Sequence, residues 1–167
     1  MTKNNSSGFT FLEMIVVIAI ASLLAVIARP STKSFIESMR LRTASNTVKQ
    51  RLFLAKARAL GDPVVHCGMY FDTASKPNKI LVFYDNDSTS LNDYGYSVGK
   101  DLLYMPSFSM PPNIKILITG SGNNQVIVFR GDGSAKTPVP SITIKDTLTA
   151  RTKTVSVLAS TGKIRVQ

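Results

Sequence analysis

The N-terminal part of the chain is apolar on every side. Residues 9–28 read FTFLEMIVVIAIASLLAVIA, and Glu13 is the only charged residue among them. As an α-helix rising about 1.5 Å per residue, this run spans ~30 Å, the thickness of the hydrocarbon core of a bilayer. The pattern therefore predicts a membrane-spanning helix. A carboxylate in hydrocarbon is costly unless it is paired or lies near the interface, so Glu13 is a candidate functional residue.

The helical pattern continues beyond this run. Apolar residues recur at spacings that fit one helical face, namely Ile36, Met39, Val48, Leu52, Ala55 and Ala59. Pro30 removes one backbone donor and crowds the preceding turn, so it predicts a kink. Gly61-Asp62-Pro63 predicts the end of the helix, because Gly suits the position after the last turn and Pro follows. We expect one long helix with an apolar half and an amphipathic half that packs on a globular head.

Beyond Pro63 the period of the pattern changes to two, which is typical of strands. Short runs rich in β-branched residues alternate with turn sequences such as Gly131-Asp132-Gly133-Ser134 and Thr161-Gly162. The expected strands are 64–71, 79–84, 114–119, 125–130, 142–145, 154–158 and 163–166. We therefore expect an α+β fold in which the long N-terminal helix packs on an antiparallel β-sheet head.

The composition narrows the classes of function. Among 167 residues there are one His, one Cys and no Trp, and the net charge is +10. One Cys excludes an internal disulfide framework, and one His with few carboxylates argues against a multi-ligand metal site. The positive charge is concentrated in residues 29–60, net +7, and residues 114–167, net +6, around a middle segment of net −3. This distribution favours polarised basic surfaces.

A short motif precedes the apolar run. A polar leader containing Lys3 ends in Gly8, and Gly8-Phe9-Thr10-Phe11-Leu12-Glu13 leads into the helix. This arrangement resembles the class III signal of type IV pilins and type II secretion pseudopilins. The resemblance implies that a prepilin peptidase cuts between Gly8 and Phe9 and that Phe9 is then N-methylated. It also implies that Glu13 neutralises the freed amine of a neighbouring subunit during assembly, an ion pair that sets register more than it adds stability.

The resemblance divides the chain at defined positions. It implies a leader peptide at 1–8, a transmembrane and filament-core helix at 9–28, an amphipathic continuation at 29–61 and a β-rich head at 62–167. Pro30 lies where the family often carries a helix-softening proline. The chain is then expected to be a single-pass protein of the bacterial inner membrane, with its head in the periplasm and later in a filament.

Two other interpretations of the N-terminus fit less well. A cleavable secretory signal is disfavoured, because Lys3 is the only basic residue ahead of the apolar run and Glu13 lies inside it. The excess of Lys and Arg after the run would by itself place the head in the cytoplasm under the positive-inside rule. We follow the motif, because the rest of the chain also resembles the exported family.

The head is most similar to the H-type pseudopilin (GspH) and FimT branch of this family. That branch has a strand ending in Phe before a Gly-containing turn, as in residues 126–134, and a closing hairpin that reads Gly-basic-x-basic-Val, as in residues 162–166. The resemblance implies a minor pilin or pseudopilin of a type II secretion pseudopilus or a type IV pilus. Its partners would be prepilin peptidase, other pilins or pseudopilins and the inner-membrane assembly platform.

The C-terminal basic residues favour an alternative function, DNA binding. Strand alternation places Lys163 and Arg165 on one face of the last strand, and Arg151 and Lys153 on one face of the strand before it. If the two strands pair, four cations cluster and attract a phosphate backbone. In the FimT branch a Gly-Arg-x-Arg motif at this place is implicated in DNA capture for uptake. Here Lys163 replaces the first Arg, which keeps the charge but loses the bidentate geometry. The competing interpretation is a solubilising edge that discourages aggregation.

No catalytic or cofactor site is expected. His66-Cys67 has no second His or Cys to work with, so the two residues are interpreted as packed strand residues. Asp85 and Asp87 resemble the start of a calcium loop, but no Gly or Glu follows at the required positions. We expect no enzymatic activity, no cofactor and no metal.

Overall fold

The computed structural model describes residues 9–62, 66–85, 95–120, 125–136 and 139–167, without the side chains of residues 28–33. The chain forms two compact units, Met1–Ser38 and Met39–Gln167. The buried apolar residues of the described chain all lie in the second unit, from Leu41 to Ile164. This unit, the head, therefore has a hydrophobic core of its own.

The helix α1 (Phe11–Gly61) has 51 residues. It ends at Gly61, as the Gly61-Asp62-Pro63 sequence predicts. Pro30 is one of the residues whose side chains are not described, so the kink expected there stays a prediction. Over the described residues, no helix has both the length and the apolar character needed to cross a membrane. The membrane span expected at residues 9–28 stays a prediction as well.

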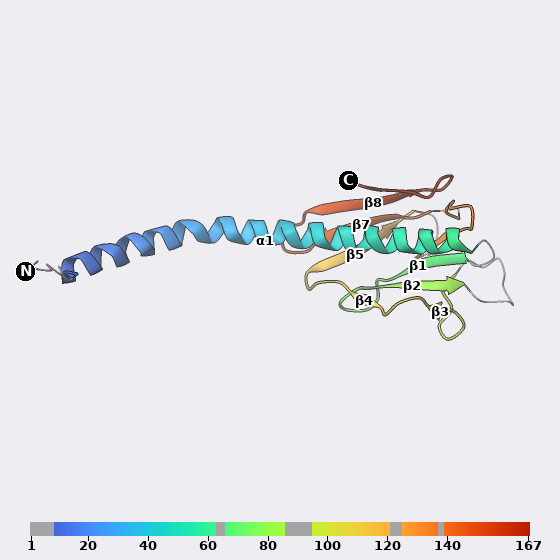
Figure 1. Cartoon of the computed structure of the whole chain (residues 1–167), viewed down its shortest axis with the longest axis horizontal. Coiled ribbons are helices and arrows are strands. Elements are labelled where there is room, and N and C mark those ends of the chain that lie inside the picture. Colours follow the sequence, from blue (N-terminus) through green and yellow to red (C-terminus); the bar gives the residue numbers. More distant parts are fainter. Residues whose placement is uncertain (1–8, 63–65, 86–94, 121–124, 137–138) are drawn as a thin grey trace, which may run out of the picture. The chain divides into compact units, whose positions relative to one another are not determined.

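The strands form two antiparallel sheets (Figure 1). Sheet A contains β1 (His66–Asp72), β2 (Lys79–Asp85), β3 (Leu102–Leu103), β4 (Phe108–Ser109) and β6 (Val126–Phe129), in the order β3-β2-β1-β6 with β4 also paired to β2. Sheet B contains β5 (Ile114–Thr119), β7 (Ser141–Asp146), β8 (Thr152–Leu158) and β9 (Lys163–Val166), in the order β5-β7-β8-β9. The ladders are antiparallel. The predicted α+β fold with an antiparallel head is confirmed.

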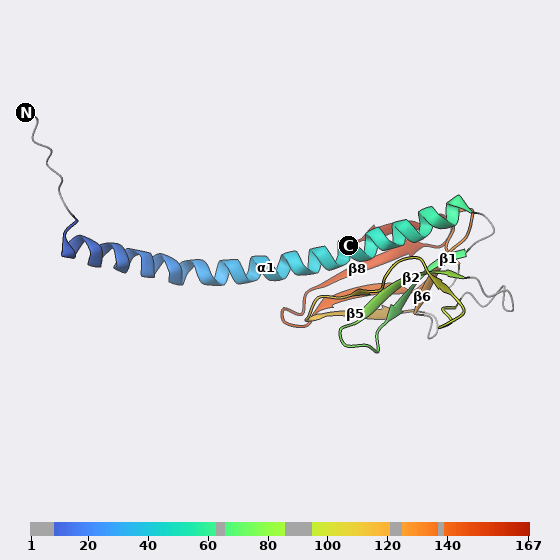
Figure 2. The same cartoon turned by 60° about the horizontal axis from the view of Figure 1, so that its bottom comes forward.

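The predicted apolar face of α1 is correct for its second half. Val48, Leu52, Ala55 and Ala59 have no exposed surface and belong to one cluster with the inner faces of both sheets. In Figure 1 this half of the helix runs between β8 of sheet B and β1 of sheet A, and Figure 2 shows it lying over the strands. Complete burial of a leucine contributes about 1.5–3 kcal/mol, so these contacts hold the helix on the sheets.

The same prediction is wrong for two residues. Ile36 and Met39 are each 44% exposed. Among the described side chains of α1, burial begins only at Leu41, and both residues precede it. The apolar spacing at residues 36 and 39 continues the sequence pattern without a core to pack on.

Basic residues of α1 bind the helix to β2 and to the segment that carries β3 and β4. The Arg51 guanidinium donates a hydrogen bond to the Pro106 carbonyl at 3.2 Å and lies 5.1 Å from the centre of the Phe108 ring. Arg58 donates from Nε to the Tyr84 hydroxyl at 2.5 Å, a contact that raises the pKa of the guanidinium. The segment that carries β3 and β4 is therefore attached to the helix as well as to β2.

These two short strands were not expected from the sequence. β3 and β4 have two residues each, too few to show a period, and both exist because they pair with β2. The division of the head into two sheets was not expected either. Strand period predicts faces within a strand, whereas the choice of neighbours depends on contacts far apart in the chain.

Candidate functional site

The start of α1 is capped by the residues of the motif itself. The N–H of Glu13 donates to the Thr10 hydroxyl at 3.3 Å, and the Glu13 carboxylate accepts from the N–H of Thr10 at 3.4 Å and from its hydroxyl at 3.5 Å. This reciprocal pair is a capping box, in which a Thr before the helix and a Glu three residues later satisfy each other's backbone donors. The carboxylate is therefore bonded to Thr10, the residue that follows Phe9 in the chain.

The capping box was missed in the sequence, although its signal is there. Thr10-Phe11-Leu12-Glu13 has the Ser/Thr-x-x-Glu spacing that marks a helix start ahead of an apolar run. Glu13 thus has a structural role in the isolated chain in addition to the assembly role predicted for it. Gly8, the other side of the expected cleavage position, lies outside the described residues.

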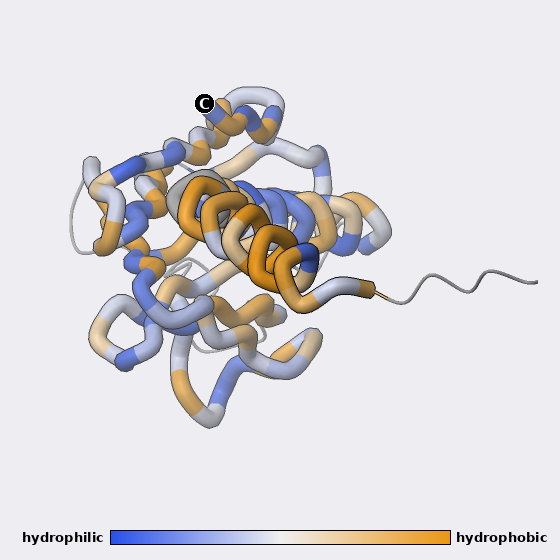
Figure 3. Tube along the Cα trace, turned by 90° about the vertical axis from the view of Figure 1, so that its left-hand side faces the viewer, coloured by the Kyte–Doolittle hydropathy of each residue, from blue (hydrophilic) through white to orange (hydrophobic). Residues whose placement is uncertain are grey.

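The first unit exposes apolar side chains on every face of its helix. Phe9, Phe11 and Leu12 are 72–83% exposed, and the large apolar residues from Met14 to Ile27 are 49–71% exposed. Figure 3 shows these turns as a nearly continuous hydrophobic colour. A helix that is apolar all round is stable only in apolar surroundings.

The C-terminal hairpin forms as expected. β8 pairs with β9, with Ser156 opposite Arg165 and Leu158 opposite Lys163. Opposed residues of antiparallel strands point to the same face. Lys163 and Arg165 are therefore exposed on the outer face of sheet B, while Ile164 between them is buried on the inner face.

The expected cluster of four cations on one side of this hairpin is wrong. Lys153 lies opposite the fully buried Ile144, so it projects from the inner face, away from Lys163. Arg151 precedes β8 and lies in the turn after β7, where its carbonyl accepts a backbone hydrogen bond. Alternation predicts which residues of one strand share a face, but only the register relates the faces of two strands.

The outer face of sheet B has a different set of cations. Lys115 of β5 lies directly opposite Lys145 of β7, and Lys163 and Arg165 lie at the other edge of the sheet. The register separates Lys145 and Arg165, the nearest members of the two pairs, by roughly 13 Å along the strands and ~10 Å across them. Among the paired residues of this face there is no Asp or Glu.

Gly162, the first residue of the Gly-basic-x-basic signature, has a packing role. Its φ is +57°, and a Cβ added to it would lie 2.1 Å from the carbonyl oxygen of Gly133. The Lys56 ammonium of α1 donates to the carbonyls of Thr161 at 2.7 Å and Gly162 at 3.2 Å. The two Gly-containing turns of the sequence pattern thus lie against each other and against the helix.

The remaining candidates fit a packed core. Cys67 is fully buried in β1, and burial raises the pKa of its thiol to about 11, so the interpretation as a packed strand residue is confirmed for it. His66 beside it is half-buried. In the part of the chain that the structure describes, no group of three or more His, Cys, Asp or Glu could hold a metal ion. Asp87 and the loop after it lie outside that part.

Two comparisons with known proteins bear on this geometry. Residues 3–28 match the family model of the prokaryotic N-terminal methylation motif. The fold is similar to that of the minor pseudopilin EpsH from the type 2 secretion system of Vibrio cholerae, with a TM-score of 0.56 and 10% sequence identity over 77% of this chain and 96% of that chain. At that identity the likeness concerns the fold alone. No curated protein sequence matches the chain.

Proposed function

We propose that this chain, a member of the type IV pilin and pseudopilin family by its methylation motif and its fold, is a minor subunit of a membrane-anchored filament. Prepilin peptidase would cut it between Gly8 and Phe9, and Phe9 would then be N-methylated. The apolar start of α1 would hold it in the inner membrane, with the head in the periplasm, until the assembly platform adds it to the filament. The role is structural and includes no catalytic step.

The observation that carries this proposal is the coincidence of the motif with a helix whose apolar side chains are exposed. The methylation motif covers residues 3–28, and the described apolar residues of that stretch are exposed on all sides of α1. Such a surface requires lipid or other apolar helices around it. A pilin is surrounded by lipid while it is in the bilayer, and by identical or related helices after it enters the filament.

Glu13 is the residue through which assembly is best tested, because its two roles can be separated. Gln keeps the acceptor oxygen that a capping box needs but has no charge, whereas Ala loses both. If the charge pairs with a neighbour's amine, Glu13→Gln should leave the helix start intact and still reduce incorporation into the filament. Glu13→Ala should reduce incorporation and also loosen the first turn.

The measurement is the share of mature protein found in sheared filaments against the share left in the membrane. Glu37→Gln is the matched control, because it removes the same charge from the second acidic residue of α1, which lies outside the motif. Equal incorporation of Glu13→Gln and the unmodified chain would exclude the charge from the assembly mechanism. Loss of incorporation in both Gln variants would point to net charge in place of a specific pair.

Within the family, we place the chain in the H-type pseudopilin and FimT branch, as a subunit of a type II secretion pseudopilus. The similarity of its fold to a minor pseudopilin supports this assignment. Deletion of the gene should then block export of type II substrates and leave surface piliation unchanged. Loss of pili with normal export would assign the chain to a type IV pilus.

A second candidate function is capture of DNA. The observation that favours it is the exposure of Lys163 and Arg165 together on a face of sheet B whose paired residues include no acid. Each phosphate contact adds about 0.9 to the slope of log affinity against log salt, so two contacts here contribute a slope near −2. Lys163→Ala with Arg165→Ala should remove that part of the salt dependence.

The control removes the other cation pair of the same face. Lys115→Ala with Lys145→Ala lowers the net charge equally without touching the hairpin. The head lacking residues 1–29 is titrated with duplex DNA over a range of salt concentrations. Equal weakening by the two double variants, or absence of binding at low salt, would remove this candidate and leave the structural role.

A further inference from the structure

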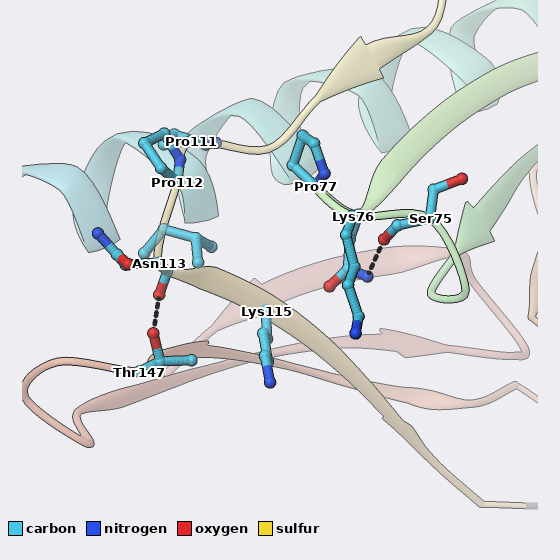
Figure 4. A pocket seen from close by; sticks show the side chains of 10 residues that line it. Ser75, Lys76, Pro77, Pro111, Pro112, Asn113, Lys115 and Thr147 are labelled. Carbon is cyan, nitrogen blue, oxygen red and sulfur yellow. Dashed lines mark hydrogen bonds between the residues drawn. The ribbon is translucent and has the colours of Figure 1, made fainter.

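A pocket of about 360 Å³ lies between three segments of the head that are distant in sequence (Figure 4). The β1–β2 turn, the segment leading into β5 and the turn after β7 all line it. Its apolar lining includes Pro77, Pro111, Pro112 and Ile114. The size lies at the lower end of the range of small-molecule sites, which are concave and mostly apolar with a few polar groups.

The first wall of the pocket is fixed by Asn78. This residue is only 8% exposed, and its amide donates to the carbonyls of Thr73 at 2.9 Å and Ser75 at 3.0 Å. Its side-chain oxygen accepts the N–H of Ile116 at 2.9 Å. One side chain therefore joins the β1–β2 turn to β5 by direct hydrogen bonds.

The second wall is fixed by Asn113 and Thr147. Asn113 has a φ of +71°, a left-handed conformation that Asn tolerates better than most residues. Its carbonyl accepts two hydrogen bonds from Thr147, from the N–H at 2.8 Å and from the hydroxyl at 3.0 Å. The pocket is thus held open by hydrogen bonds on both sides, so binding would require little reorganisation.

Two cations border this apolar surface. Figure 4 shows the side chains of Lys76 and Lys115 extending in the same direction, on the side of the pocket away from the three prolines. In the described chain neither ammonium group has an ion pair or a hydrogen bond. Lys115 also lies directly opposite Lys145, and like charges in that position destabilise a sheet unless an anion compensates them.

We propose that this pocket binds a small phosphate ester with a compact apolar body. The apolar body would lie against the prolines, and the phosphate would lie between the two lysine ammonium groups. Lysine supplies a point charge with rotatable donors, which is a common way for proteins to bind phosphate oxygens. The site is separate from the N-terminal segment and from the hairpin, so it stands independently of the filament role.

The test is calorimetric titration of the full chain in micelles of an uncharged detergent, with phenyl phosphate as the probe. Phenyl phosphate should bind saturably at one site per chain, and more tightly than inorganic phosphate, which has no apolar body. Lys76→Gln with Lys115→Gln should weaken phenyl phosphate binding by about tenfold or more, since it removes two charge-assisted contacts. Both lysines are exposed, so the variant retains the core.

The matched control is Lys163→Gln with Arg165→Gln, which removes the same charge from the far edge of sheet B. This control should bind phenyl phosphate as the unmodified chain does, within about twofold. Absence of saturable binding would overturn the proposal. Equal weakening by the two double variants would replace the site with general attraction to a basic protein, and equal affinity for inorganic phosphate would exclude a contribution from the proline wall.

Discussion

Replacing Gly162 by alanine should destabilise the head by about 2–5 kcal/mol. Two effects add up to this figure. A left-handed conformation costs a residue with a Cβ about 1–2 kcal/mol, and the φ of Gly162 is +57°. The new Cβ would also lie 2.1 Å from the Gly133 carbonyl oxygen. Because that neighbour is backbone, the two turns must separate, and overpacking of this kind costs about 1–3 kcal/mol more.

Gly99→Ala is the control that separates the two effects. Gly99 also has a positive φ, +86°, but nothing lies within 4 Å of its added Cβ. It should therefore show the conformational cost alone, about 1–2 kcal/mol.

The assay is thermal and urea unfolding of the head lacking residues 1–29, followed by circular dichroism. At about 4 °C per kcal/mol, Gly162→Ala should lower Tm by about 8–20 °C and Gly99→Ala by about 4–8 °C. If Gly162→Ala costs no more than Gly99→Ala, the contact between the two turns does not hold the hairpin, and the packing role assigned to this glycine is refuted.

Three further predictions concern the stability of the same head. Burial raises the pKa of the Cys67 thiol from 9.0 to about 11, so the folded state holds this proton more tightly than the unfolded state. The stability that this proton contributes is fully present below pH 9 and should fall by about 2–3 kcal/mol as pH rises through 11. Urea unfolding at alkaline pH should show this loss in the unmodified head and not in Cys67→Ala. Leu52→Ala should lower the free energy of unfolding in urea by about 3–5 kcal/mol, because it leaves a cavity in the core. Phe53→Ala should lower it far less, because the Phe53 side chain is 47% exposed. Similar losses for the two variants would contradict the orientation of α1. Lys56→Met should lower the free energy of unfolding by about 1 kcal/mol, because it removes the hydrogen bonds to the β8–β9 turn, and an unchanged value would show that these bonds are not needed.

The elements of the fold could be predicted from the sequence because their patterns are local. The end of α1 at Gly61 and the strands β5 and β9 lie at the expected residues. The predicted apolar face of α1 is correct around Leu52, because the spacing there reflects a real core. It extends wrongly to Met39 because an apolar spacing alone does not say where the packing partner ends.

The relations between elements could not be predicted in the same way. Lys153 and Lys163 each follow the alternation of their own strand, but the register of β8 and β9 places them on opposite faces. The proline-lined pocket depends on residues near 77, 112 and 147, which no local pattern connects. The capping box of Thr10 and Glu13 is the opposite case, because its Thr-x-x-Glu spacing is local and visible in the sequence.

The central claim is that the chain is a processed pilin-like subunit, and the mature N-terminus tests it most directly. Protein extracted from membranes of cells with an active prepilin peptidase should begin at Phe9 and carry an N-terminal methyl group when analysed by mass spectrometry. Gly8→Val should block this cut and leave the leader in place. A mature protein that begins at Met1, or one cut after Ala28, would contradict the account.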